Sequence, residues 1–482
     1  MSQFLFHYVR LEPPTWVFLS TLLVVGLFLM FHRFWSLRNL DIFLVLAFTP
    51  GMMMVYEGRQ KAFRNSEHEG IPAMVGVGGQ TESDASASPV PLPKSNGSQE
   101  TWTPKRLLYW GFLWLIVCAG LLVIRMLLDT TIVRRPLLDP NLSSGGMLFL
   151  GTSLLLYLMI NVATSSPVEQ RLSSPEMGPG YVLLSFLPQI ATTPQLNEAN
   201  DANENELTKE RSDYKLTLAR ILAIGANLTL VFCILAIGYW HFGNLKTGVG
   251  AATFYLLLPY TAHMTGRVDH VVPSALLLLA LLMYRQPFVA GLFLGCAAGV
   301  VYYPFSLLPL WCSFYWQRGI RRFVGGFTVS ITALVLAMIL LHPSNVIQDL
   351  RYMFGLKQVA MTGMDGIWGL GWYPVMRIPI IVAFVLLSLS FVFWPPQKNL
   401  ATLLSCSAAI MAGTQFWHGF GGGLYMAWFI PLALLTVFRP NLDYCIALEV
   451  VRQTRRKESR KSSPSPDPSP PASEPATSEP AA

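Results

Sequence analysis

The sequence predicts an all-α fold, a polytopic transmembrane helix bundle of about twelve or thirteen spans. The chain has 482 residues, of which 52% are hydrophobic and only 13% are charged. That is roughly half the charged share of an average soluble domain. Its mean hydropathy is +0.45, and apolar runs alternate with short polar joints along most of it. Because a bilayer cannot satisfy exposed backbone polar groups, this pattern leaves helices as the spanning structure.

The predicted spans follow from a requirement of about 20 mostly apolar residues per helix, with shorter helices tolerated inside a bundle. They lie near residues 16–35, 40–56, 107–128, 146–164, 217–239, 248–265, 271–284, 288–301, 304–316, 323–341, 375–394, 399–415 and 421–438. The first run is long and flanked by bulky and basic residues, so we expect a retained span and no cleaved signal peptide. The runs 288–301 and 304–316 count as two spans because Pro304 breaks helical hydrogen bonding between them.

Polar stretches divide the chain into four parts. These are two N-terminal spans (1–57), a polar and partly disordered linker (58–106), a main bundle (107–438) with polar loops at 165–216 and 342–374, and a tail (439–482). The tail begins with a basic cluster and ends in a Pro/Ser/Ala-rich segment, a composition typical of disorder.

Basic residues in the short loops predict the orientation in the membrane. Short loops rich in Lys and Arg stay in the cytoplasm, which places the tail, with its cluster from Arg452 to Lys461, on that side. Counting backwards gives about thirteen spans with the N-terminus outside the cell membrane (the cytoplasmic membrane in a bacterium). The net charge of +7 resides mostly in these loops and the tail, so it does not indicate nucleic-acid binding.

The first candidate site is the ionisable stretch Arg267, Asp269 and His270 between two apolar runs. Ionisable groups are costly against lipid, so these residues should lie at a water interface or line a cavity. Asp269 is the candidate catalytic residue, and Arg267 and His270 are candidate substrate-binding residues. In the alternative interpretation, Asp269 caps the helix that begins near Val271.

The span count places Arg267, Asp269 and His270 on the extracytoplasmic face, together with other polar and aromatic residues. The candidate substrate-binding residues among them are His263, Tyr302, Tyr303 and His418. The loop 342–374, rich in tryptophan and glycine, is typical of a lid or binding surface. Aromatic residues at a membrane surface also have a simpler interpretation, as interfacial anchors.

A second candidate site combines two carboxylates and two arginines. Asp129 and Asp139 are alternative catalytic residues, and Arg134 and Arg135 could bind phosphate through their guanidinium groups. The same four residues could equally form a structural turn with internal ion pairs. The span count puts this loop on the cytoplasmic side, opposite Asp269, whereas an error of one span would bring the two sites together.

The sequence indicates no metal and no other cofactor. Its six cysteines have no Cys-x-x-Cys spacing, and the phosphate-loop, dinucleotide and zinc-protease motifs are absent.

Part of the chain resembles the membrane glycosyltransferases of family 87. The matching segments are 255–259, 266–269, 290–298, 302–304, 307–309 and 318–322, all within about 251–322, and then 421–435. The resemblance implies the C-type glycosyltransferase fold and a sugar donor carried on polyprenyl phosphate. It also implies transfer to an acceptor on the extracytoplasmic side, with membrane lipids as partners.

The chain departs from that family at one motif. A lysine usually precedes the Tyr-Pro pair, whereas residues 301–304 here read Val-Tyr-Tyr-Pro. Loss of that lysine removes a contact to the lipid phosphate and bears on activity more than on fold. Two functions therefore stay open: a glycosyltransferase, or a non-catalytic membrane protein such as a transporter or an envelope assembly factor. A helix broken at Pro304 would suit a transporter.

Overall fold

The described part of the protein is built almost entirely of helices. The computed structural model describes residues 12–68, 102–132, 137–165, 206–341, 346–353, 364–396 and 398–440, with isolated positions at 167–168, 184, 187, 189–190 and 343. The chain divides into two units, Met1–Arg439 and Pro440–Ala482, and the helical bundle belongs to the first. Its one described sheet pairs β1 (Pro167–Val168) antiparallel with β2 (Gln189–Ile190), with Pro167 opposite Ile190.

The α-helices differ widely in length. They are α1 (Pro13–Phe28), α2 (Leu37–Leu46), α3 (Phe48–His68), α4 (Pro104–Leu128), α5 (Ser144–Thr164), α7 (Glu206–Ala236), α8 (Leu245–Leu257), α9 (Pro259–Met264), α10 (Val268–Leu282), α11 (Pro287–Val300), α12 (Leu308–Tyr315), α13 (Ile320–Leu341), α14 (Val346–Met353), α15 (Arg377–Ser390), α16 (Leu400–Gly413) and α17 (Ile430–Phe438). Short helices include η5 (Tyr303–Leu307), η6 (Gly366–Gly369), η8 (Thr414–Phe416) and η9 (Met426–Trp428).

Among the described residues, five helical stretches are long and apolar enough to cross a membrane. They are Leu37–Ala62, Pro104–Thr131, Ser144–Thr164, Tyr214–His241 and Ile320–Leu340. Large apolar side chains such as Ile124, Phe149 and Leu336 are more than half exposed on these stretches. Extended apolar surface of this kind suits lipid better than water. The structure thus confirms the predicted all-helical class, and its apolar helices fit a location in a membrane.

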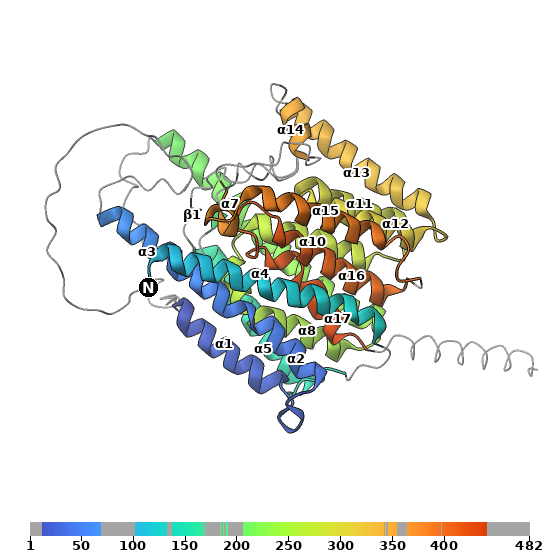
Figure 1. The fold of residues 1–482 in the computed structure, drawn as a ribbon, viewed down its shortest axis with the longest axis horizontal. Helices are drawn as coiled ribbons and strands as arrows, with labels where there is room; N and C mark the ends of the chain where they lie inside the picture. The colour runs from blue at the N-terminus through green and yellow to red at the C-terminus, as the bar shows by residue number, and fades with distance from the viewer. Residues whose placement is uncertain are drawn as a thin grey trace, which may run out of the picture. The chain divides into compact units, whose positions relative to one another are not determined.

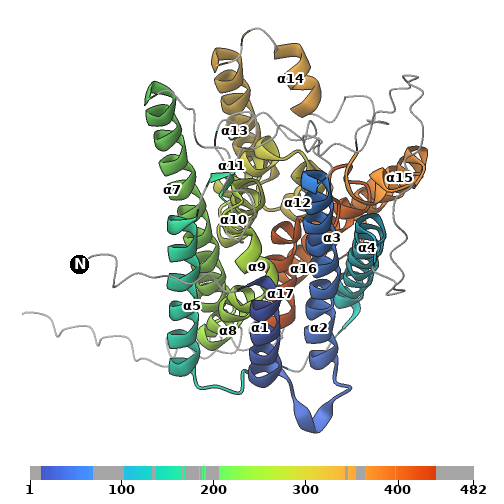
Figure 2. The same ribbon diagram turned by 90° about the vertical axis from the view of Figure 1, so that its left-hand side faces the viewer.

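The C-terminal helices form the inside of the bundle. α16 packs against α4 and α17, and α17 packs against α8. Every residue of α16 and α17 is buried. Figure 2 shows these two helices between α10 on one side and α3 on the other, and Figure 1 shows the same bundle from a second direction. Residues at the two ends of α17 are therefore held by neighbours on all sides.

The predicted spans 16–35 and 40–56 each contain a helix end, at Phe28 and at Leu46, and three later spans are also broken. The run 248–265 is broken at Pro259 into α8 and α9. The run 304–316 contains η5 and the eight-residue α12, and 421–438 contains a loop, η9 and the nine-residue α17. The prediction of one continuous helix in each was wrong because an apolar run also describes a short helix buried in protein, where neighbours can satisfy broken backbone bonds.

Glycines bring α11 and α13 into close contact. Gly291, Gly295 and Gly299 recur every fourth residue on α11 and so share one face. A side chain on Gly291 would clash with the Phe323 carbonyl oxygen of α13, and one on Gly326 of α13 would clash with the Phe288 carbonyl oxygen of α11. Small residues at this spacing allow membrane helices to approach each other closely.

We expect Gly326→Ala to destabilise the protein, because the added methyl group would force α11 and α13 apart. The expected cost is about 1–3 kcal/mol, as for other overpacked sites. Gly325 is the matched control, since a Cβ there would meet nothing within 4 Å. The measurement is the thermal midpoint in detergent, which should fall for Gly326→Ala and hold or rise for Gly325→Ala. Equal midpoints would contradict this account of the packing.

Candidate functional site

Ionisable clusters lie at the two ends of α17. Just before α17, the indole Nε1 of Trp428 donates to the backbone carbonyl of Asp269 at 3.4 Å. Just after it, Arg439 forms an ion pair with Asp129. The nine residues of α17 span about 14 Å. We call these regions the Asp269 end and the Asp129 end.

Asp269 is a buried carboxylate that forms an ion pair with Arg267, two residues before it. It lies in the first turn of α10, with Arg267 as the residue before the helix. Arg267 Nη2 is 2.9 Å from Asp269 Oδ2, and Arg267 Nε is 3.3 Å from Oδ1. The carboxylate side chain is 3% exposed, whereas the Arg267 side chain is 26% exposed. A carboxylate in the first turn also interacts favourably with the helix dipole, so Asp269 stabilises α10 as well.

His270 connects Asp269 to a second layer of aromatic residues. Its Nδ1 is 2.7 Å from the Tyr260 hydroxyl, which accepts a hydrogen bond from the backbone N–H of Ala427 at 3.0 Å. Its ring stacks on Tyr425 with centroids 4.4 Å apart. Its Nε2 lies 3.7 Å from Asp269 Oδ2. The fully buried imidazole is thus fixed in orientation by α9, α10 and the segment before α17.

His418 also contacts the ring of Tyr425. The Tyr425 ring lies 4.6 Å from the His418 ring, edge to face. His418 Nδ1 is hydrogen-bonded to the hydroxyl of Tyr303, and both residues are buried. Tyr302 continues the series, with its ring centroid 4.2 Å from that of Tyr303. The predicted residues Asp269, His270, His418, Tyr303 and Tyr302 therefore form one contiguous cluster.

A glycine-rich turn, residues 419–423, connects His418 to Tyr425. Gly421 and Gly423 have positive φ angles of 72° and 101°, which residues with side chains rarely adopt. The N–H of Asp365 donates to the Gly419 carbonyl at 3.0 Å, and the N–H of Gly421 donates to the Asp365 carbonyl at 3.3 Å. Part of the predicted binding loop 342–374 thus packs on the turn, while residues 354–363 lie outside the described residues.

Two arginines near this turn were not identified from the sequence. Arg377 is 1% exposed, and its Nε donates to the Trp417 carbonyl at 3.0 Å. Arg59 of α3 pairs with Asp365 at 2.7 Å, and this pair is half exposed. An arginine inside the predicted span 375–394 was a usable signal for Arg377, because intramembrane charges usually mark a special role.

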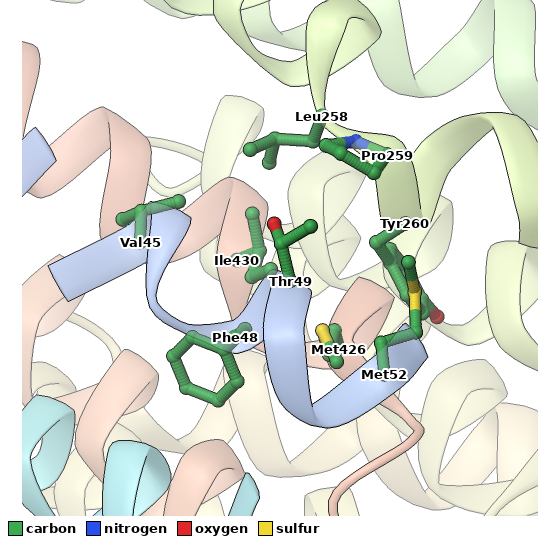
Figure 3. Close-up of a pocket in the computed structure, with 9 residues that line it drawn as sticks. All are labelled: Val45, Phe48, Thr49, Met52, Leu258, Pro259, Tyr260, Met426 and Ile430. Atoms are coloured by element: carbon green, nitrogen blue, oxygen red, sulfur yellow. The ribbon is translucent and has the colours of Figure 1, made fainter. Parts of the chain in front are cut away.

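His263 lies on α9, the helix whose Tyr260 lines a small cavity. Its ring packs on Tyr56 of α3 with centroids 5.3 Å apart. The cavity has a volume of about 10 Å³, and Figure 3 shows α3 residues facing Tyr260 across it. Its lining residues are Val45, Phe48, Thr49, Met52, Leu258, Pro259, Tyr260, Met426 and Ile430. That is room for about one water molecule, so a sugar or lipid chain would need the helices to move.

In the second candidate site, Asp129 and Asp139 form ion pairs with different partners. Asp129 is fully buried, with its two oxygens 3.2 Å from Arg125 Nη1 and 2.7 Å from Arg439 Nη2. Asp139 is half exposed and pairs with Lys246 at 2.9 Å. The expectation that Arg134 and Arg135 pair with these carboxylates falls on residues outside the described ones.

The orientation can be tested by cysteine labelling. Tyr373, in the loop at the Asp269 end, is exposed, and Cys445 lies in the tail. With the other cysteines replaced by alanine, an impermeant maleimide should label Tyr373→Cys in intact cells. It should reach Cys445 only after permeabilisation, because basic segments stay in the cytoplasm. The reverse pattern would overturn the predicted sidedness.

Within the described residues, no three histidine, cysteine, aspartate or glutamate side chains lie close enough to hold a metal ion. Comparisons of the chain with protein-family models, curated proteins and solved structures give no match.

Proposed function

We propose that the protein is a multi-pass membrane glycosyltransferase that moves a sugar from a polyprenyl-phosphate carrier to an acceptor on the extracytoplasmic side. The observation that carries the proposal is the buried Asp269 carboxylate with its guanidinium and imidazole neighbours, at the break between α9 and α10. Burying ionisable groups among membrane helices is costly, which favours a functional reason for keeping them. The local resemblance to family 87 at residues 266–269 supports the same assignment.

The proposed reaction needs a base and a cation, and the cluster offers both. Asp269 would accept the proton of the acceptor hydroxyl as that oxygen attacks the anomeric carbon of the sugar. The bond between this carbon and the phosphate oxygen breaks, and its electron pair leaves with the polyprenyl phosphate. Arg267 and Arg59, which are both partly exposed, would stabilise that phosphate through charge-assisted hydrogen bonds.

A transporter is the alternative, and one feature favours it. Helical structure is interrupted between α8 and α9 and again between α11 and α12, and broken helices are typical of transport sites. A transporter would move a solute without consuming a lipid-linked sugar, so the two functions make different predictions for the same sample.

The test is a transfer assay with the purified full-length chain in lipid vesicles. Polyprenyl-phosphate hexoses and pentoses are the donors, and a panel of sugars and glycolipids provides the acceptors. We expect acceptor-dependent release of polyprenyl phosphate. Solute uptake into the vesicles, with no release of polyprenyl phosphate from any donor, would replace the proposal with the transporter.

A further inference from the structure

Asp269 is closed to substrate in this structure. Both carboxylate oxygens are engaged by Arg267, and the side chain is almost fully buried. A base must have an oxygen within hydrogen-bond reach of the proton that it removes. The arginine therefore has to move before Asp269 can contact an acceptor hydroxyl.

Arg267 is placed to leave the carboxylate for an outside anion. It precedes α10 with an extended backbone, and its side chain is the partly exposed member of the pair. Arg59 lies at the same end of the bundle, half exposed, and pairs with Asp365, whose backbone bonds to the turn that carries His418 and Tyr425. Two partly exposed guanidinium groups at this end of the bundle suit phosphate oxygens, because a guanidinium can bind two of them at once.

His270 holds a replacement hydrogen bond for Asp269. The Tyr260 hydroxyl accepts from the Ala427 N–H, and we assign its own proton to the bond with Nδ1 of His270, because a buried hydroxyl should also donate. In the neutral ring, the imidazole proton then lies on Nε2. This buried Nε2 has no hydrogen-bond partner among the described residues and lies 3.7 Å from Asp269 Oδ2.

We propose that Arg267 is a latch on Asp269 that a phosphate group opens. The phosphate draws the guanidinium away, and the Nε2–H of His270 takes its place on the carboxylate, which leaves one oxygen free for the acceptor. The inference rests on the proposed function for the source of the phosphate, the polyprenyl-phosphate carrier.

Binding affinities of the full-length protein in nanodiscs test the latch without requiring transfer. The probes are a polyprenyl phosphate, the corresponding polyprenol and inorganic phosphate. Arg267→Gln should weaken binding of the polyprenyl phosphate about tenfold, the effect of losing one charge-assisted hydrogen bond. Asp269→Asn should tighten it several-fold, because the guanidinium no longer has to leave a charged partner. Arg267→Lys keeps the charge and should bind the polyprenyl phosphate with intermediate affinity. It therefore serves as a control for misfolding of Arg267→Gln.

The double variant separates a latch from a general charge effect. In the Arg267→Gln background, Asp269→Asn should leave the affinity unchanged, whereas a general charge effect would tighten binding in both backgrounds and overturn the latch. Equal affinity for polyprenol and polyprenyl phosphate would also overturn it. Tight binding of inorganic phosphate alone would overturn the lipid as the source. Failure of the transfer assay alone would count against the proposed function and leave this result intact.

Discussion

Asp269→Asn is expected to abolish sugar transfer while the protein still folds and inserts. Asparagine keeps the shape of the side chain and can still accept a hydrogen bond from Arg267, but it cannot take a proton. Loss of a general base usually costs about 10²–10⁴-fold in rate. The measurement is acceptor-dependent release of polyprenyl phosphate, with monodispersity in detergent reporting on folding.

Asp139→Asn is the matched control for this experiment. The same substitution there alters a half-exposed carboxylate that pairs with Lys246 at the Asp129 end, so transfer should stay near wild type. The alternative that Asp269 caps a helix beginning near Val271 was wrong, because α10 begins at Val268 and its N-cap position is held by Arg267. Full activity of Asp269→Asn would therefore identify the residue as a structural group of the first turn and not as a base. Asp269→Glu should keep measurable activity, because it retains an acid that can take the proton.

Much of the outer bundle could be predicted from the sequence. The predicted spans 107–128 and 146–164 agree with α4 (Pro104–Leu128) and α5 (Ser144–Thr164) to within a few residues. These helices expose apolar surface along most of their length, so the length of the apolar run determines the length of the helix. The inner helices did not follow this rule, because α12 and α17 contact protein and can end early.

The site was predictable where its residues are neighbours in sequence. Asp269, Arg267 and His270 stood out as ionisable residues between apolar runs. Tyr260 and Tyr425 were missed, because Tyr260 binds Ala427 across 167 positions and tyrosines are common in apolar runs. A local pattern cannot indicate such a contact.

Charged residues inside the predicted spans indicate buried contacts that the sequence analysis did not predict. Asp41, Arg125 and Arg377 all fall within them, and the structure places each in a buried contact. An intramembrane charge implies a partner, but the partner of Asp129 is Arg439, 310 positions away. The sequence predicts that a partner exists without identifying it.

The Asp129 end is held together by a buried network of four charges. Arg125 contacts Asp41 through two hydrogen bonds of 2.5 and 2.8 Å and reaches Asp129 at 3.2 Å. Arg439 contacts the other oxygen of Asp129 at 2.7 Å. Two carboxylates and two guanidinium groups balance in charge, and together they join α2, α4 and the end of α17. None of the four can lose its partner without a large penalty, because the pairs are out of water.

Asp129→Ala is therefore expected to destabilise the protein strongly, by about 3–5 kcal/mol, since it removes the buried carboxylate that Arg439 contacts and one of the two that Arg125 contacts. Asp139→Ala removes only a half-exposed pair and should cost about 1 kcal/mol or less. Thermal midpoints in detergent compare the two. In the Arg439→Ala background, Asp129→Ala should cost less than in the wild type, because part of the penalty belongs to the orphaned Arg439. If Asp129→Ala and Asp139→Ala lowered the midpoint equally, the network would not be what anchors α17.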